Sequence, residues 1–416
     1  MSQVKPKPDQ DATFQQKLDY TKNLDFPQSE YEQRYQRITR GMKDWGIDLL
    51  LVTTEQHVRY VSGFKNLMWH ARTDHPMMAL ISADPGREPV VVVPEFLEGA
   101  ARASTWFEHV RWPRRGPTYG DTLAVALDVI GEMGHTGGRI GLELGFGQPL
   151  TLGYQRFNEL RAGLPKAELV DAMEVFLDVR RIKSEREIET IKAACDITCH
   201  AYEAGFKAAR PGMTEDELNR IITSDMYAQG AEMHQLCISS SATGYCVADG
   251  LPSNYPLEGG TFLWLDGGAG YKGYWADCCR MLMFGPADER HRRWFEASLA
   301  ANHAAHEAIV PGGRVGAAMD AAEVELDRLG LGQYRIGDLI GHGLGMEPHE
   351  PPYLSRGFRS GDDQTFEPGM VVTIEVSMSD PGAWEKGRYA IEDSFAVTRD
   401  GREQLTAGLS TEVWQA

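Results

Sequence analysis

The chain has no excess of basic residues, few cysteines and no long apolar run. Its 416 residues carry 42 lysines and arginines against 60 acids, a net charge of −18. Such a charge argues against nucleic acid or an anionic membrane surface as a partner. No apolar stretch approaches the roughly 18 residues of a spanning helix, and residues 1–25 are polar, without the apolar core of a secretory signal. We therefore expect a cytoplasmic protein that binds neither nucleic acid nor a membrane.

Cysteine chemistry is also scarce. The six cysteines lack the spacing of thiolate zinc sites, and a chain of this size needs no disulfide framework. Cys195 and Cys199 lie one helical turn apart, which is typical of a reduced packing pair. Thiolate metal centres and disulfide scaffolds are therefore not expected.

The length of the chain suggests two domains. Residues 1–25 are predicted to form a flexible arm, and residues 26–177 alternate helical and strand-like segments, which indicates an α/β domain. Helices are predicted at residues 29–45, 121–133 and 155–162, and strands at 47–52, 77–81, 89–93, 139–143 and 167–170. A long charged helix that begins near Ser184 places the boundary near residue 178, so the second domain is expected to span 178–416.

The second domain contains a weak internal repeat. Pro211-Gly212 follows the helix that begins at Ser184, and Pro311-Gly312 follows a helix predicted from residue 290. Residues 214–217 read as a capping box that starts another helix, and residues 317–329 are predicted to be its counterpart. Each half then ends in a hairpin. Two helices and a hairpin, twice over, predict an α+β shell with a pseudo-twofold antiparallel sheet covered by helices.

Both hairpins carry acids. Asp266 ends one apolar run, a turn with Gly267, Gly268, Gly270 and Gly273 follows, and Asp277 begins the next run. The second hairpin is predicted from residues 370–375 and 389–397, which carry Glu375 and Glu392. Any one such acid is more often a turn cap or a solvated residue. An acid within an apolar strand costs several kcal/mol unless it is paired, so the joint pattern favours a site.

Clustered carboxylates point to bound cations. Four neighbouring acids with no basic run nearby either have strongly raised pKa values or are neutralised by cations, and two divalent ions balance four charges. His342 adds an imidazole to the acids Asp266, Asp277, Glu375 and Glu392. Oxygen-rich ligands with one imidazole suit Mn²⁺, Co²⁺, Fe²⁺ or Zn²⁺, and we expect manganese first.

At these residues the chain resembles a known family, the pita-bread metallopeptidases (methionine aminopeptidase, aminopeptidase P, prolidase) together with creatinase and its relatives. The matching text lies at residues 266–280, 341–350, 367–375 and 391–393, within a resemblance that covers roughly residues 178–400. The resemblance implies the pita-bread fold for the second domain, a creatinase-like first domain and a homodimer.

The resemblance also assigns roles. Asp266 is expected to bind one metal ion, His342 and Glu375 the other, and Asp277 and Glu392 both. Such a pair of ions activates a bridging water and polarises a carbonyl. Glu375 is expected to shuttle a proton, and His349 to contact the substrate near the scissile carbonyl. A structural histidine among Pro348, Pro351 and Pro352 is the alternative for His349. The expected activity is hydrolysis of an amide C–N bond, as in Xaa-Pro peptidases.

Two positions depart from the family pattern. Its peptidases carry a histidine some 17 or 18 residues before the first aspartate, where this chain has residues 246–250 and no histidine. Ala390 stands where an arginine is common, and Arg388 lies two places earlier. Asp249 could fill the vacancy and attract a cationic substrate, or be a loop acid without a role.

The first domain offers further candidates at residues 67–75. In creatinase-like relatives this domain contributes substrate-binding residues to the partner subunit. We hypothesise that Arg72 and His70 hold a substrate carboxylate, and that Trp69 packs on its apolar or cationic part. Chance clustering at the surface is the alternative.

Other activities remain open on the same fold. A small-molecule enzyme, an ectoine-hydrolase-like or creatinase-like C–N hydrolase, is the alternative to an enzyme with a short-peptide substrate. A dimethylsulfoniopropionate lyase ranks lower, because Gly268 stands where that enzyme has an extra aspartate. A non-catalytic binding module is disfavoured, since such modules usually lose metal ligands and all five are present here.

Overall fold

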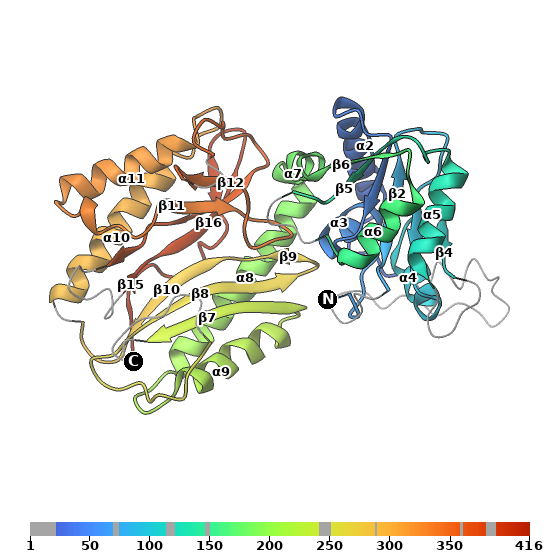
Figure 1. Ribbon diagram of the computed structural model, residues 1–416. Helices are drawn as coiled ribbons and strands as arrows, with labels where there is room; N and C mark the ends of the chain where they lie inside the picture. Colours follow the sequence, from blue (N-terminus) through green and yellow to red (C-terminus); the bar gives the residue numbers. More distant parts are fainter. Residues whose placement is uncertain are drawn as a thin grey trace. The chain divides into compact units, whose positions relative to one another are not determined.

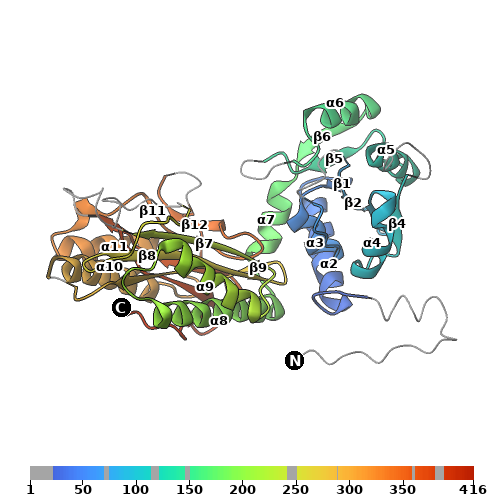
Figure 2. The same ribbon diagram turned by 90° about the horizontal axis from the view of Figure 1, so that it is seen from below.

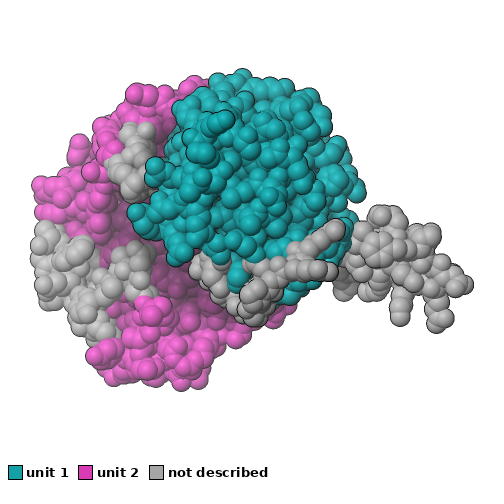
Figure 3. Space-filling view, turned by 45° about the vertical axis from the view of Figure 1, so that its right-hand side comes forward, with its two compact units in different colours: residues 1–179 teal, residues 180–416 magenta. Residues whose placement is uncertain are grey.

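The computed structural model describes residues 22–69, 75–113, 121–145, 150–240, 251–287, 289–357, 361–379 and 388–416. The chain divides into two compact units, residues 1–179 and 180–416 (Figure 3). The sequence placed this division near residue 178. Most of the predicted arm lies outside the described residues.

Unit 1 is built on a six-stranded sheet with the order β4-β3-β2-β1-β5-β6 (Figure 1). Its strands are β1 Leu49–Val52, β2 Met78–Ser82, β3 Val90–Val92, β4 His109–Arg111, β5 Arg139–Leu142 and β6 Glu168–Asp171. Its helices are α2 Gln28–Asp44, α3 Glu55–Ser62, α4 Glu98–Ser104, α5 Thr122–Met133, α6 Tyr154–Gly163 and α7 Met173–Arg181, which runs into unit 2, with the 3-10 helix η1 Glu95–Leu97. Helices α5 and α6 share one apolar core with the sheet. Strand β1 pairs antiparallel with β2 and parallel with β5, so the sheet is mixed, as an α/β unit allows.

Unit 2 contains a ten-stranded sheet whose main path is β12-β11-β13-β16-β10-β8-β7. These strands are β7 Met233–Ser240, β8 Phe262–Tyr271, β10 Cys278–Met283, β11 Leu339–Gly343, β12 Glu350–Ser355, β13 Val371–Glu375 and β16 Glu392–Val397. The short strands β9 Tyr274–Trp275, β17 Arg402–Gln404 and β18 Trp414–Gln415 attach to it, and β14 Met378–Ser379 pairs separately with β15 Arg388–Tyr389. All pairings are antiparallel among these described strands except β10 with β18.

Two pairs of helices cover the two halves of this sheet (Figures 1 and 2). Helices α8 Glu185–Ala208 and α9 Glu215–Ala228 form a core with β7, β8 and β10, while α10 Glu289–Glu307 and α11 Gly316–Arg328 form another with β11, β13 and β16. The 3-10 helix η3 Gly332–Tyr334 follows α11. Capping boxes begin α8 at Ser184 and α9 at Thr214, each closed by a glutamate three residues later. The predicted repeat of two helices and a hairpin, and with it the pita-bread fold, is confirmed.

Of the four glycines in the predicted turn, Gly273 alone lies at the reversal of the chain. Gly267, Gly268 and Gly270 belong to β8, and the chain reverses at Lys272 and Gly273, which have φ values of 49° and 79°. Gly267 has φ +108°, and a Cβ there would lie 2.2 Å from the carbonyl oxygen of Gln235. The glycine is therefore required by the close approach of β7 and not by a reversal of the chain. Among the described residues, every helix is too short or too polar to span a bilayer.

Candidate metal centre

Strand register brings three of the predicted ligands into one row. Asp266 of β8 pairs with Cys279 of β10, Cys279 pairs with Glu392 of β16, and Glu392 pairs with Glu375 of β13. Directly paired residues point to the same face of a sheet, so these acids share one face across neighbouring strands. Asp277 lies two residues before Cys279 and therefore on the same face.

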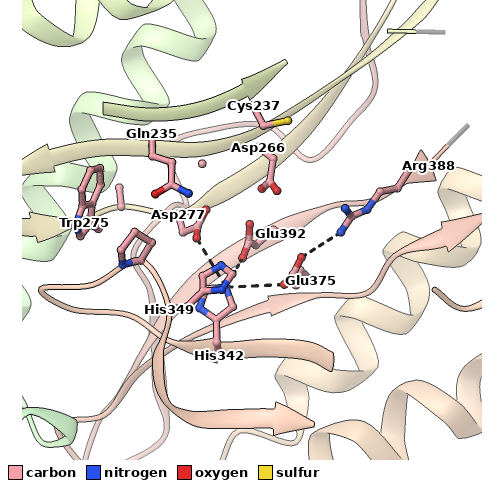
Figure 4. A pocket seen from close by; sticks show the side chains of 14 residues that line it. Gln235, Cys237, Asp266, Trp275, Asp277, His342, His349, Glu375, Arg388 and Glu392 are labelled. Atoms are coloured by element: carbon pink, nitrogen blue, oxygen red, sulfur yellow. Dashed lines mark hydrogen bonds and ion pairs between the residues drawn. The ribbon is translucent and has the colours of Figure 1, made fainter. Parts of the chain in front are cut away.

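His342 of β11 completes the cluster (Figure 4). Its Nε2 atom lies 3.8 Å from Asp277 Oδ2, Glu375 Oε1 and Glu392 Oε1. The five predicted ligands alone form two three-residue groups whose ligand atoms lie within 4.8 Å of one another, His342 with Glu375 and Glu392, and Asp266 with Asp277 and Glu392; His349 joins Asp277 and His342 in a further group. All five predicted ligands meet, and the two groups share Glu392.

The electrostatics of the cluster fit bound cations. Glu392 is 1% exposed, and burial, followed by the charges of Asp277, Asp266 and Glu375, raises its pKa well above the usual value. Its Oε1 atom is buried and has no hydrogen-bond partner within the described parts of the chain. A buried oxygen left in this way is costly unless a cation or donor meets it, so the acids present fit divalent ions.

The imidazole of His342 has the protonation state and tautomer that a metal ligand needs. Burial, with a contribution from His349, lowers its pKa to about 3, so the ring is neutral at physiological pH. Its Nδ1 lies 3.1 Å from the carbonyl oxygen of Gly343, which can only accept a hydrogen bond. Nδ1 is therefore the donor, and the lone pair of Nε2 faces the acids, as in ligating histidines.

A cavity of about 140 Å³ opens over this cluster. Besides the ligands, Gln235, Cys237, Trp275, Pro348, His349 and Arg388 contribute to its lining (Figure 4). The exposed His349 lies with its ring centroid 3.8 Å from that of His342. The structure thus brings His349 to the metal ligands. Cys237, which sequence reasoning did not place in the site, faces Asp266 directly across β7 and β8.

Arg388 is a further pocket residue that the sequence left outside the site. Its Nε donates to Ser377 Oγ at 3.0 Å, and its Nη2 donates to Glu375 Oε2 at 3.5 Å. The guanidinium also lies 4.5 Å over the ring of Trp264. Arg388 belongs to β15 and Glu392 to β16, so no periodicity along a single strand linked the two residues in the sequence.

The remaining substrate-binding candidates are not among the described residues that line this cavity. Asp249, His70 and Arg72 lie outside the described residues. Trp69 is 4% exposed in unit 1, where its indole Nε1 donates to the carbonyl oxygen of Thr53 at 3.3 Å and its ring contacts Phe64. Their roles stay predictions.

Comparison with known proteins agrees with this arrangement. The profile of the Creatinase/Prolidase N-terminal domain matches residues 34–182, and that of metallopeptidase family M24 matches residues 189–399. An uncharacterized peptidase of Bacillus subtilis, YqhT, is 30% identical over 87% of this chain and 94% of its own length. The Xaa-Pro dipeptidase of Pyrococcus furiosus is 27% identical over 90% and 98%.

Solved structures give the same result. The Xaa-Pro dipeptidase from Bacillus anthracis superposes with a TM-score of 0.79 at 26% identity, covering 93% of this chain and all of that one. The prolidase from Pyrococcus horikoshii gives 0.76 at 26% identity, over 92% and 99%. A family profile over half of the chain, together with these relatives and the clustered ligands, shows that the protein is a hydrolase of metallopeptidase family M24, which implies divalent metal ions at this centre.

Proposed function

We propose that the protein is a dinuclear-metal-dependent Xaa-Pro dipeptidase that cleaves the amide C–N bond before proline. The observation that carries the proposal is the pair of three-residue ligand groups that share Glu392 on one face of the sheet. Two of the relatives described above are Xaa-Pro dipeptidases by name. Manganese is the metal we propose first, because oxygen ligands outnumber nitrogen ligands.

The ligand groups divide the roles. Asp266 would hold one ion, and His342 with Glu375 the other, while Asp277 and Glu392 would contact both. When bound, the two ions supply an activated bridging water and a Lewis acid for the carbonyl. Glu375 is placed to accept the proton of that water and to return it to the leaving nitrogen.

Two residues of the lining act on the substrate. His349, exposed beside His342, is placed to donate a hydrogen bond to the developing oxyanion, an interaction worth about 2.7–4 kcal/mol in comparable sites. Among the described residues that line the cavity, Arg388 is the only arginine or lysine. We assign it the free carboxylate of the dipeptide, because a fixed guanidinium binds a carboxylate with two parallel donors.

A second candidate, a small-molecule C–N hydrolase, rests on one specific observation. Ala390 is 1% exposed and leaves the family's arginine position without a charge, so the charged group enters from Arg388 instead. This changes the shape of the substrate side of the pocket while the metal ligands stay complete.

The test is turnover of Xaa-Pro dipeptides by manganese-loaded protein, with Xaa-Ala dipeptides as the comparison. We expect about 1–10³ turnovers per second on the proline substrates. Metal-loaded protein that leaves every Xaa-Pro dipeptide intact would favour the small-molecule hydrolase.

Asp277→Ala tests the centre itself. We expect this variant to lose both bound metal and turnover, because without the negative carboxylate the two cations would repel each other. Asp44→Ala, at the exposed end of α2, is the matched control and should retain both. Stoichiometric metal in Asp277→Ala would contradict the assignment.

A further inference from the structure

A buried asparagine contacts the backbone directly beside two of the metal ligands. Asn302 of α10 is 3% exposed, and its Nδ2 donates to the carbonyl oxygen of Ile374 at 2.8 Å and to that of Ile391 at 2.7 Å. Ile374 immediately precedes Glu375, and Ile391 immediately precedes Glu392. One side-chain amide therefore joins the two strands of the second hairpin at the positions where they present their acids.

The first hairpin has an equivalent contact. Tyr202 of α8 is fully buried, and its hydroxyl lies 3.1 Å from the carbonyl oxygen of Gly267 and 3.3 Å from that of Cys278. Gly267 immediately follows Asp266, and Cys278 immediately follows Asp277. The tyrosine hydroxyl thus joins the two strands of the first hairpin beside the other two acids.

The two contacts are related by the internal repeat. Asn302 lies one hundred positions after Tyr202, on the helix that occupies the same place in the second half. Each side chain contacts the peptides next to one expected terminal ligand and one expected bridging ligand. Tyr202 does so beside Asp266 and Asp277, and Asn302 beside Glu375 and Glu392. The residue types differ: the amide of Asn302 offers two N–H donors to its two carbonyls, whereas the two carbonyls beside Tyr202 share its single O–H.

We propose that Tyr202 and Asn302 are positioning residues of the metal centre, each setting the spacing of one pair of carboxylates. The proposal rests on the proposed dinuclear centre. A ligand must sit within about 0.2 Å of its preferred metal distance, and a shift of the adjoining peptide is transmitted directly to the carboxylate. Loss of an outer partner of a metal ligand typically costs 10–100-fold in metal affinity or activity.

Neighbouring Thr198 provides a control for a purely structural role. Its hydroxyl is buried on the same helix as Tyr202 and accepts a hydrogen bond from the backbone N–H of Ala269 at 2.9 Å, on the same strand β8. Ala269 lies three residues beyond Asp266. Thr198→Val therefore removes a helix-to-strand hydrogen bond without releasing a ligand-bearing peptide.

The experiment is calorimetric titration of Mn²⁺ and Co²⁺ into the metal-free full-length chain, with melting temperature and kcat measured in parallel. We expect Tyr202→Phe and Asn302→Leu to weaken metal binding about 10–100-fold and to lower kcat. Thr198→Val should lower the melting temperature and leave metal affinity within twofold of the unaltered protein. The Co²⁺ absorption spectrum should change in the first two variants only.

One outcome would overturn the proposal. Metal affinity and a Co²⁺ spectrum that stay unchanged in both variants, while only the melting temperature falls, would reduce Tyr202 and Asn302 to structural residues. Tyr202→Phe removes a single oxygen, so the test stands if Asn302→Leu does not fold. Failure of the unaltered protein to cleave Xaa-Pro dipeptides would refute the proposed substrate alone, because metal affinity is measured without substrate.

Discussion

Arg388 adds a positive charge to a pocket whose lining includes several carboxylates. Four carboxylates surround the expected metal positions, and the guanidinium is held beside them by Ser377, Glu375 and the ring of Trp264. Because three contacts fix the group, little conformational entropy remains to be lost when a substrate anion binds. The residue is therefore suited to recognise a small anionic group.

Replacement of Arg388 should change substrate preference. For Arg388→Ala we expect KM to rise about 10-fold or more for Xaa-Pro dipeptides, since a hydrogen bond to a charged group is worth about 1.5–3 kcal/mol. KM for the corresponding Xaa-Pro amides, which lack the carboxylate, should change little. Steady-state kinetics on both substrates checks this, and Arg388→Lys serves as the charge-retaining control. Equal losses on both substrates would show that Arg388 acts through Glu375 instead.

His306 is a second informative side chain, away from the metal ligands. It stacks on Phe395 with ring centroids 5.0 Å apart, and burial, followed by the charges of His303 and Arg402, lowers its pKa from 6.5 to about 4. The unfolded chain therefore binds more protons than the folded chain between these pH values, and this contribution to stability is lost as pH falls from 6.5 towards 4.

His306→Phe tests this linkage. The variant keeps the ring against Phe395 and removes the titration, so its free energy of unfolding should fall less than that of the unaltered protein between pH 6.5 and 4. Urea unfolding at several pH values provides the measurement. An unchanged slope in His306→Phe would disprove the assignment.

At the scale of elements, the start of β12 is anchored by a buried ion cluster. Glu350 is 2% exposed and lies 2.5 Å from Arg180 Nη2 and 2.7 Å from Lys183 Nζ. Burial alone raises the pKa of Glu350, but Lys183 and Arg180 outweigh it and the net shift is downward. The segment that opens unit 2 is thereby tied to the strand that follows His349.

Glu350→Ala should destabilise unit 2 by about 3–5 kcal/mol, because removal of one partner leaves buried charges without compensation. Denaturant unfolding gives the number. The matched control is Glu347→Ala, since Glu347 is a more exposed acid 3.5 Å from the same Arg180 Nη2. A loss no larger than that of the control would show that water solvates the two cations.

Local sequence signals predicted several of the helices correctly. Thr214 begins its helix as the capping pattern predicted, the long helix begins at Ser184 as expected, and the helix predicted at residues 121–133 is α5, capped by Asp121. The glycine-rich turn was misplaced because a glycine required by a neighbouring strand looks, in sequence, like one required by a turn. Helix α3 went unrecognised, since its eight residues are too few for a helical apolar period to be read from the sequence.

For the whole molecule, metal and folding are coupled through unit 2. Both overlapping ligand groups lie within residues 180–416, and metal that binds only the folded state stabilises it by about 2.7 kcal/mol at a hundred times the dissociation constant. In a unit of this size, each kcal/mol of stabilisation raises the melting temperature by about 2–4 °C.

Removal of metal by a chelator should therefore lower the melting temperature of unit 2 and leave unit 1 unaffected. Differential scanning calorimetry, with and without re-added Mn²⁺, checks the shift and its reversal. Asp277→Ala should melt at the chelated temperature under both conditions. If chelator left the melting temperature of the unaltered protein unchanged, the result would argue against bound metal.

The candidate metal ligands could be selected from the sequence because an acid such as Glu375 or Glu392 inside an apolar strand is costly without a partner ion. The contacts that surround them were not readable. Arg388 enters the pocket, and Asn302 reaches the peptides beside Glu375 and Glu392, through strand register and helix packing. Those arrangements depend on contacts between residues far apart in the chain, and no local pattern of types or spacing encodes such distances.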